Sequence, residues 1–378
     1  MLLKTVCHVI TGLNDGGAEG VLFRLCSHDL AHAHVVVSLS DEGKYGPLLR
    51  AMGVEVHSLG MRPNVPSFFV LVKFIRWLRL YKPDVVQTWM YHADLFGSIA
   101  ARVAGIKAIV WGVRHTTFEP GKSKKTSIFI AKLLAKLSWW LPVRIAVCAQ
   151  RAMDVHEALG YDRAIMRFIP NGYDLADFMP KPVEARALRA EWVAEPDISL
   201  IGTVGRYDPQ KDHANLLQAL AILHSRKIPL RCVLVGTNLD DDNQELIEQI
   251  QNLGLEEMVI LLGRRTDIAA VMSALDVHVL PSAYGEAFPN VVAEAMACET
   301  PCVVTDVGDA AYIVGDTGWI VPPRDADALA NALANALIAS QQANWQERCV
   351  LARKHIEEKF GIQRMVTAYS ELWIEVVT

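Results

Sequence analysis

The sequence predicts an α/β protein with two doubly wound parallel sheets, and three observations lead to that expectation. The chain has 378 residues, whereas a single hydrophobic core stops growing at roughly 250–300 residues. Apolar residues make up 52% and charged residues 21% of the chain, which is the composition of an ordinary globular protein with ample core. Short β-rich runs alternate with helix-length stretches in both halves, as in parallel sheets covered by helices.

The first half is expected to form one domain, over residues 1–168. A cluster of Pro, Asn, Gly and Asp at 169–182 marks the crossover to the next domain. Strand candidates lie at 5–11, 34–39, 54–59, 84–89, 108–113 and 144–149, and helical patterns lie at 17–31, 67–81, 91–104 and 124–140.

The second half repeats this alternation and is expected to form a second domain, over residues 169–358. A C-terminal helix at 359–378, after a break near Gly361, is expected to return to the first domain. Ligands of open parallel sheets bind beyond the carboxyl ends of the strands, so the expected site is the cleft between the domains. Strand candidates here are 198–205, 231–236, 258–263, 276–282, 301–306 and 318–323.

The net charge of −5 is unevenly distributed along the chain. Residues 1–168 carry 21 Lys and Arg against 12 Asp and Glu, whereas residues 169–378 carry 16 against 30. A basic half could face phosphates or an anionic lipid surface, but such asymmetry also arises without function. The negative overall charge and the absence of a nucleic-acid-reading motif argue against a nucleic acid partner.

The N-terminal stretch indicates a cytoplasmic protein. It reads as a buried strand that runs into a Gly-rich turn, without the features of a signal peptide, and no segment is apolar enough to span a membrane. The seven cysteines are scattered, with no CxxC pair. We therefore expect reduced, mostly buried thiols rather than disulfides or a zinc site.

Two glutamates, Glu286 and Glu294, flank a candidate helix start. Pro289 suits the first helical position, so the helix is expected from about 289 to 298. Eight helical residues rise about 12 Å, which is too far for the acid and base of a glycoside hydrolase, whose carboxyl groups lie roughly 5–9.5 Å apart. The helix N-terminus instead predicts a phosphate or pyrophosphate site, at which each carboxylate could accept hydrogen bonds from sugar hydroxyls. A capping glutamate and a solvated one are the alternative.

Basic side chains follow the first strand of the second half. Arg206 and Lys211, beside Gly205, combine a bidentate fork with a point charge, which suits a leaving diphosphate. The acidic run at 240–242 is expected to begin a helix rather than to bind a metal. No metal site is expected.

In the first half, Gly16 and Gly17 follow the first strand. They permit close approach of a ligand to the backbone, although a tight strand-to-helix turn would need the same residues. His115 follows the strand at 108–113 and is expected to face the cleft, although a single histidine is more often a packed or surface residue.

The helical pattern at 124–140 is basic and amphipathic. Lys125, Lys132 and Lys136 share one face, and Trp139 and Trp140 follow. Such a helix either lies on an anionic membrane or simply covers the sheet with its apolar face. The basic first half and a second aromatic, basic helix at 68–82 favour the membrane.

Taken together, these motifs resemble the retaining GT-B glycosyltransferases that use nucleotide sugars and share a Glu-x7-Glu motif, namely glycosyltransferase family 4, or group 1. The resemblance spans most of the chain. The motifs are "GGAE" at 16–19, "KPDVVQTWMYHADLFG" at 82–97, "RH" at 114–115, "IPNGYD" at 169–174, "GRYDPQKD" at 205–212, "LLGRRTDI" at 261–268 and "PSAYGEAFPNVVAEAMACETPCVVTDVGDAAYIV" at 281–314.

The resemblance implies a GT-B fold, in which two Rossmann-like domains face a deep cleft. It implies transfer of a hexose or N-acetylhexosamine from a nucleotide diphosphate sugar, with UDP expected, to a lipid-linked or growing saccharide. Retention would follow from front-face attack, without metal or cofactor. The members it most resembles assemble cell-surface polysaccharides such as O-antigen and lipopolysaccharide. The basic first half and its two basic, aromatic helices would then dock at the inner face of the cytoplasmic membrane, where a lipid-linked acceptor would be presented.

The resemblance also implies roles for individual residues. Arg206 and Lys211 would hold the diphosphate, Glu286 the sugar and Glu294 the ribose, while His115 would lie near the reaction centre. The implied catalytic residues are Arg206, Lys211, His115 and Glu286. Further donor contacts would come from Gly16, Gly17, Gly205, Arg264, Arg265, Ala287, Phe288, Pro289 and Asn290, and acceptor or membrane contacts from Tyr91, His92, Lys125, Lys132, Lys136, Trp139 and Trp140.

One departure from the family pattern is Ala287, where members often carry Gly, which would narrow the pocket slightly. Two other functions stay open at this point. One is a sugar-nucleotide-binding scaffold without turnover, and the other is a GT-B-fold epimerase.

Overall fold

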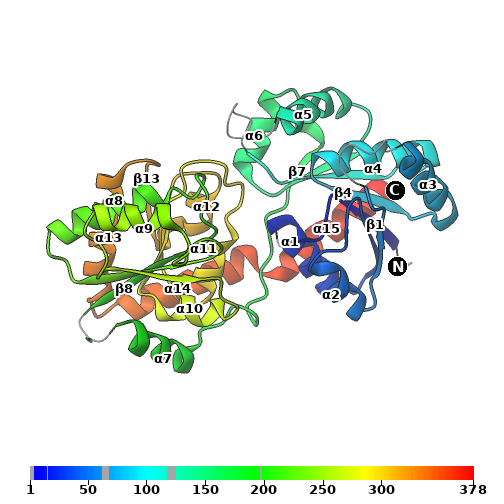
Figure 1. The fold of residues 1–378 in the computed structure, drawn as a ribbon. Coiled ribbons are helices and arrows are strands. Elements are labelled where there is room, and N and C mark those ends of the chain that lie inside the picture. Colours follow the sequence, from blue (N-terminus) through cyan, green and yellow to red (C-terminus); the bar gives the residue numbers. More distant parts are fainter. Residues whose placement is uncertain (1–3, 15, 62–67, 117–124, 194, 196–197) are drawn as a thin grey trace. The chain divides into compact units, whose positions relative to one another are not determined.

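The computed structural model (Figure 1) describes residues 4–14, 16–61, 68–116, 125–193, 195 and 198–378. The chain divides into two compact units. Unit 1 comprises Met1–Gly172 with Ile362–Thr378, and unit 2 comprises Tyr173–Gly361. The polypeptide therefore crosses between the units twice.

Unit 1 contains a parallel sheet that has seven strands within the described residues, in the order β3-β2-β1-β4-β5-β6-β7. The order reverses between β1 and β4, as in a doubly wound fold. The strands are β1 Lys4–Ile10, β2 His32–Ser38, β3 Glu55–Ser58, β4 Val85–Trp89, β5 Ile109–Val113, β6 Arg144–Val147 and β7 Met166–Phe168. The helices are α1 Gly17–His28, α2 Tyr45–Ala51, α3 Phe68–Tyr81, α4 Tyr91–Ala104, α5 Lys125–Leu137, α6 Gln150–Ala158, the 3₁₀ turn η1 Arg163–Ile165, and α15 Ile362–Val377.

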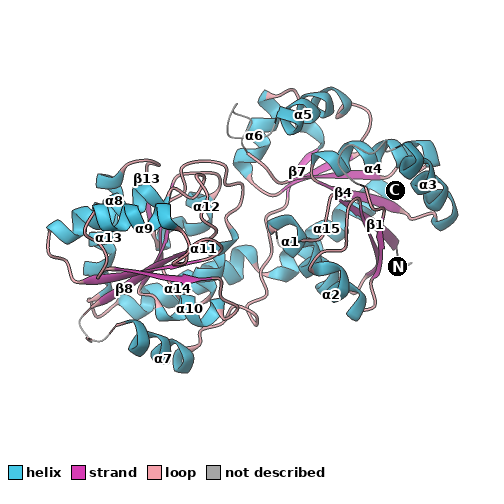
Figure 2. Ribbon diagram, viewed as in Figure 1, coloured by secondary structure: helices cyan, strands magenta, loops and turns pink. Residues whose placement is uncertain are grey.

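Unit 2 contains a second parallel sheet, of six strands in its described part, in the order β10-β9-β8-β11-β12-β13. Helices cover both faces of this sheet (Figure 2). The strands are β8 Ser199–Val204, β9 Leu230–Val235, β10 Val259–Gly263, β11 Val277–Leu280, β12 Cys302–Thr305 and β13 Trp319–Val321. The helices are α7 Pro182–Trp192, α8 His213–Ser225, α9 Gln244–Asn252, α10 Ile268–Ala274, α11 Asn290–Ala297, α12 Ala310–Val314, the 3₁₀ turn η2 Gly315–Thr317, α13 Ala326–Ser340 and α14 Trp345–Phe360.

The expected fold class, two doubly wound parallel-sheet domains, is confirmed. Each of the twelve strand candidates overlaps a strand of the structure, with ends that differ by no more than a few residues. Strand β7 was not expected, because Met166–Phe168 is three residues long and holds the exposed Arg167 instead of an apolar run.

Two helix starts differ from the sequence-based expectation. Helix α11 begins at Asn290, so Pro289 is its N-cap residue and not its first helical residue. The acidic run at 240–242 lies in the turn before α9. The side chain of Asn243 accepts the N–H of Leu246, which places the helix start after the acidic residues. The expectation that the acidic run begins the helix was therefore wrong.

Helix α15, the last helix of the chain, completes the core of unit 1. Tyr369 and Trp373 are almost fully buried among residues of β1, β4 and α1. The indole N–H of Trp373 donates to Oε1 of Gln87 at 3.1 Å, and the hydroxyl of Tyr369 accepts from Arg114 at 2.9 Å. These polar contacts fix the helix on the sheet in one register.

The seven cysteines are all buried and form no disulfide. Burial raises the pKa of most of these thiols, for example that of Cys232 to about 12, so they are protonated at neutral pH. In the part of the chain that the structure describes, no helix combines the length and the apolar character needed to cross a membrane.

Candidate active site

The carboxyl ends of β8 and β9 approach each other closely in unit 2. A Cβ atom on Gly236 would overlap the carbonyl oxygen of Gly205, and Gly236 has a φ of +149°, so only glycine fits there. The N–H of Gly205 donates to Val235 at 2.8 Å, and that of Tyr207 donates to Thr237 at 2.8 Å. The loop that carries Arg206 and Lys211 is thereby anchored to the neighbouring strand.

Within this loop, Asp208 organises the turn between β8 and α8. Its carboxylate accepts the N–H of Gln210 at 2.9 Å and Nε of Arg206 at 3.0 Å. Burial alone would raise the pKa of Asp208, but these hydrogen bonds and the charge of Arg206 hold it below its usual value. The Arg206 side chain is 61% exposed, so it can leave Asp208 to pair with a bound anion, while water solvates the Asp208 carboxylate.

Lys211 and Glu286, which the sequence places 75 positions apart, form a buried ion pair. Nζ of Lys211 donates to Oε1 of Glu286 at 2.7 Å, and their side chains are 16% and 8% exposed. The aliphatic stem of Lys211 lies against Gly205. A ligand therefore meets Lys211 and Glu286 as a joined pair rather than as two separate contacts.

The ionised form of Glu286 is stabilised by its surroundings. Burial would raise the pKa of this carboxyl, but the charge of Lys211 and hydrogen bonds from Lys211, Ser282 and Gln210 outweigh burial and lower it. The hydroxyl of Ser282 donates to the same oxygen as Lys211, at 2.7 Å. Glu286 is thus a fixed, charged hydrogen-bond acceptor.

The backbone from Gly285 to Pro289 is held from two sides. Gly285 has a φ of +79° and packs against the side chain of Gln210, and a Cβ on Gly308 would overlap the carbonyl oxygen of Glu286. Ala287 accepts the N–H of Asp309 at 2.9 Å. Phe288 is buried beside Phe360, with a centroid separation of 5.3 Å. The peptide groups of this loop are therefore what a ligand can meet, while the Phe288 ring belongs to the core.

Helix α11 follows directly and directs its N-terminal N–H groups toward this loop. Oδ1 of Asn290, its first residue, accepts the hydroxyl of the fully buried Tyr173 at 2.6 Å. Glu294 lies one turn further along and is half-buried. Two carboxylates with a helix N-terminus between them suit a ligand that has hydroxyl groups at both ends and phosphate in the middle.

Arg264 and Arg265 follow β10 at the same edge of the sheet. Arg264 is exposed. Arg265 donates to both oxygens of Asp267, at 2.8 and 2.6 Å, and its guanidinium lies 5.6 Å from the ring centroid of Trp192. Because its side chain is engaged in this way, Arg265 offers a ligand its main chain rather than its charge.

Unit 1 has a hollow of about 490 Å³ at the carboxyl ends of β1, β4 and β5. It brings together three residues that the sequence singled out, namely Tyr91, His92 and His115. Asn14, Glu19, Ser40 and Ser127 also line it and were missed. A polar residue in the loop after a strand is the signal that could have found Asn14 and Ser40.

Gly16 and Gly17 lie next to this hollow at the start of α1. Gly16 is the N-cap residue, and its carbonyl accepts the N–H of Gly20 at 3.1 Å. A Cβ on Gly16 would overlap the carboxylate of Glu19. The side chain of Glu19 thus folds back over the helix start, as an acidic residue in the first turn commonly does.

Tyr91, which lines the hollow, forms a buried pair with His156. The hydroxyl of Tyr91 and Nε2 of His156 are 2.9 Å apart, and Nδ1 of His156 lies 2.7 Å from the carbonyl oxygen of Ala152. Since a carbonyl only accepts, Nδ1 carries the proton and Tyr91 donates to Nε2. Burial lowers the pKa of His156 to about 4, which keeps the ring neutral. The ring of Tyr91 meets that of His115 edge to face at 6.3 Å.

Two family models match the chain. The family described as "Glycosyl transferases group 1" matches residues 185–370, and that described as "Glycosyltransferase Family 4" matches residues 15–177. The chain belongs to the family 4, or group 1, glycosyltransferases.

Similar proteins of known name are also glycosyltransferases. The UDP-Gal:alpha-D-GlcNAc-diphosphoundecaprenol alpha-1,3-galactosyltransferase of Escherichia coli is 28% identical over 319 residues, which cover 81% of this chain and 79% of that protein. The phosphatidyl-myo-inositol mannosyltransferase of Mycolicibacterium smegmatis is 36% identical over 199 residues, which cover 51% of this chain and 48% of that protein.

The crystal structure of HepE from Anabaena in complex with UDP has the same fold. It superposes with a TM-score of 0.85 at 22% identity, over 98% of this chain and 100% of that one. The GT-B type of the glycosyltransferase follows from such neighbours and from the two parallel sheets.

The glycosyltransferase exposes a basic and aromatic surface on unit 1, formed by Lys125, Lys132, Lys136, Trp139 and Trp140. All five residues are exposed, the two indoles by 67% and 62%. Helix α5 ends at Leu137, so both tryptophans lie just beyond it, and residue 124 of the expected helix lies outside the described residues. Leu133, an apolar residue of the same helix, is 36% exposed. Lys132, Lys136 and Trp139 border a hollow whose opposite wall is formed by residues 158–160.

A buried imidazole cluster lies in the core of unit 1. His8, Cys26 and His34 carry donor atoms within 4.8 Å of one another, close enough to share a metal ion. However, the indole of Trp89 donates to Nδ1 of His8 at 3.2 Å, so the His8 proton lies on Nε2 and points to Nδ1 of His34 at 3.0 Å. The imidazole lone pairs that a metal would need are already used by this hydrogen-bond chain.

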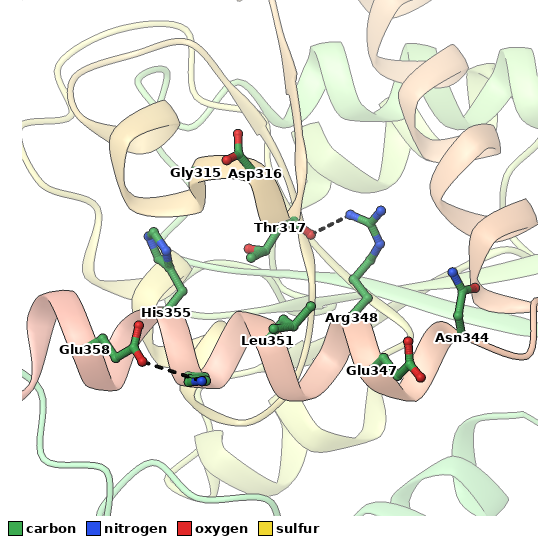
Figure 3. Close-up of a pocket in the computed structure, with 10 residues that line it drawn as sticks. Gly315, Asp316, Thr317, Asn344, Glu347, Arg348, Leu351, His355 and Glu358 are labelled. Carbon is green, nitrogen blue, oxygen red and sulfur yellow. Dashed lines mark hydrogen bonds and ion pairs between the residues drawn. The ribbon is translucent and has the colours of Figure 1, made fainter.

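A third hollow, of about 490 Å³, lies along α14 beside η2 in unit 2 (Figure 3). Because η2 precedes β13, this hollow lies at the amino ends of the strands, away from the loops that carry Lys211 and Glu286. Arg348 donates to the carbonyl oxygen of Thr317 at 2.9 Å, and Lys354 pairs with Glu358 at 3.7 Å. It shares no lining residue with the candidate active site.

Proposed function

We propose that this glycosyltransferase transfers a hexose or N-acetylhexosamine from a UDP-sugar to a hydroxyl group of a lipid-linked or growing saccharide, with retention of configuration. The observation that carries the donor half of the proposal is the Lys211–Glu286 ion pair at the carboxyl end of the sheet, beside the N-terminus of α11. The names of two similar proteins support it, since the E. coli relative uses UDP-Gal with a lipid diphosphate acceptor and HepE was crystallised with UDP-glucose.

In the proposed mechanism, unit 2 stabilises the leaving group. Negative charge develops on the diphosphate as the glycosidic bond breaks, and Arg206, Lys211 and the N–H groups of α11 supply positive potential there. Glu286 accepts from a hydroxyl of the sugar and Glu294 from the ribose. Because these groups supply the neutralising charge, we propose that no metal ion takes part, and activity that survives EDTA would support this.

The acceptor side of the proposal is assigned to unit 1. The hollow lined by Tyr91, His92 and His115 offers hydroxyl, imidazole and carboxylate groups that suit a saccharide. The acceptor hydroxyl would attack from the face that the diphosphate leaves, and an oxygen of the diphosphate would take its proton. This front-face route retains the configuration and needs no separate general base.

A screen of UDP-, GDP-, ADP- and dTDP-sugars by thermal shift tests the donor. A UDP-sugar should raise the melting temperature, because a ligand that binds only the folded protein stabilises it. The responding donor, radiolabelled, is then mixed with a lipid-linked oligosaccharide. Transfer to the lipid supports the enzyme, whereas binding without transfer or hydrolysis would indicate a scaffold.

We further propose that the basic and aromatic surface docks on an anionic membrane, where a lipid-linked acceptor is presented. Lysines beside exposed indoles are the groups that bind such a surface. Flotation with vesicles of phosphatidylcholine and phosphatidylglycerol should recover the protein at low salt, and the double variant Trp139→Ser/Trp140→Ser should lose binding. A control variant, Leu351→Ser, changes an exposed apolar residue of α14 in unit 2. No flotation of the wild type would contradict the proposal.

A further inference from the structure

Ser282 is a buried hydroxyl that the proposed mechanism does not use. It follows β11 by two residues and is fully buried. Its Oγ donates to Oε1 of Glu286 at 2.7 Å, the oxygen that also accepts Nζ of Lys211 at 2.7 Å. The two donors fix this oxygen from two directions.

The position of Ser282 is itself fixed by both neighbouring strands. Its carbonyl oxygen accepts the hydroxyl of Thr305, the last residue of β12, at 2.6 Å, and Thr305 is fully buried. The next residue, Ala283, donates its N–H to the carbonyl oxygen of Gln210 at 2.9 Å, in the loop after β8. A chain of contacts therefore runs from β12 through Ser282 to Glu286 and Lys211.

We propose that Ser282 is a positioning residue, which acts through Glu286 by aiming its carboxylate so that Lys211 and Glu286 meet the donor sugar as one rigid pair. This inference rests on the proposed function of the site. A hydroxyl that merely fills space in the core would stabilise the fold without influencing the sugar.

Two probes separate these roles. UDP-sugars engage Glu286 through the sugar, whereas UDP lacks the sugar, so loss of the Ser282 hydroxyl should weaken only the former. The variants are Ser282→Ala, which removes the hydroxyl, and Ser282→Thr, which keeps it. Thr305→Val removes the hydroxyl that donates to the carbonyl oxygen of Ser282. The matched control is Thr300→Val. Thr300 lies just before the amino end of β12, and its buried hydroxyl donates to the carbonyl oxygen of Met272 at 2.7 Å, so this variant also removes one buried hydrogen bond.

The experiment is calorimetric titration with UDP and with UDP-glucose, UDP-galactose and UDP-N-acetylglucosamine. For the sugar that binds the wild type, Ser282→Ala should bind roughly 10-fold more weakly, about 1.4 kcal/mol, while UDP binding changes by less than about 2-fold. Ser282→Thr should restore most of the affinity, and Thr300→Val should match the wild type. Equal losses for UDP and the UDP-sugar, or no loss, would overturn the inference.

The pH dependence gives a second readout. A hydroxyl that donates to Glu286 favours its ionised form, so Ser282→Ala should move the acid limit of UDP-sugar binding to higher pH, and Ser282→Thr should not. If no UDP-sugar binds the wild type, the proposed donor is wrong. The role of Ser282 is then decided by denaturant unfolding. If the loss in free energy of unfolding caused by Ser282→Ala is smaller at pH 4 than at pH 7.5, the contact with ionised Glu286 is supported. If the loss is the same at both pH values, the contact is refuted.

Discussion

Removal of the Lys211 charge should reverse the way in which Glu286 affects stability. In the wild type the pKa of Glu286 is lowered, so the pair stabilises unit 2 above the pKa of an unfolded glutamate, roughly 4.3, and loses this contribution as the pH falls through the folded value. In Lys211→Met, the charge that opposes the effect of burial is gone, so the pKa of Glu286 in the folded protein rises above its value in the unfolded chain. Stability then declines as the pH rises through that window.

The size of the effect follows from burial. Loss of one partner of a buried ion pair costs about 3–5 kcal/mol. The donors Ser282 and Gln210 remain, and the Lys211 side chain is 16% exposed, so the lower end applies and we expect about 3 kcal/mol at pH 7.5. For a unit of this size that is a fall in melting temperature of about 6–12 °C.

Unfolding of the wild type and of Lys211→Met by guanidinium, at pH 7.5 and at pH 4, measures this loss in free energy of unfolding. The difference in free energy of unfolding should be largest at pH 7.5 and should shrink at pH 4, where Glu286 is neutral in the variant. The control Lys354→Met removes a lysine that is 61% exposed and pairs with Glu358, and should change stability by less than about 0.5 kcal/mol. A Lys211→Met cost that is the same at both pH values would refute the reasoning.

Three further results are expected. Gly308→Ala should cost about 2 kcal/mol or more in the free energy of unfolding, because φ is +60° and the Cβ would overlap the carbonyl oxygen of Glu286; an unchanged unfolding midpoint would contradict the close approach. Tyr173→Phe should cost about 1 kcal/mol through its lost hydrogen bond to Asn290, measured as a fall of a few degrees in melting temperature. The pKa of His156 is lowered to about 4, so an unfolded histidine takes up a proton first and stability falls from pH 6.5 toward pH 4; His156→Gln should lose less than the wild type between pH 7 and pH 5 by denaturant unfolding, and an equal loss would count against the buried neutral ring.

Strands were predictable from the sequence because a doubly wound sheet is buried on both faces. Runs such as 232–235 are therefore continuously apolar and stand out from their surroundings. β7 does not, because a short strand with the exposed Arg167 carries no such pattern. The start of α9 shifted because one side-chain acceptor, Asn243, decides where a helix begins, and several neighbouring acidic residues compete for that role in the sequence.

The candidate site was predictable as a set of residues but not as a set of contacts. Lys211 and Glu286 were assigned to the phosphate and to the sugar separately, since nothing in a linear sequence shows that their side chains meet. Tyr91 was singled out, but its partner His156 was not, because their contact depends on how α4 and α6 pack. Long-range polar contacts of this kind depend on tertiary structure.

The division of the chain into units has a consequence for synthesis. Unit 2 is one continuous stretch, Tyr173–Gly361, and can fold as soon as it leaves the ribosome. Unit 1 begins first but requires Tyr369 and Trp373 for its core, so its sheet must wait, with an apolar groove uncovered, while about two hundred further residues are made. At the 5–20 residues per second of translation that wait lasts roughly 10–40 s, and a chain that stops before α15 would carry a folded unit 2 attached to an unfinished unit 1.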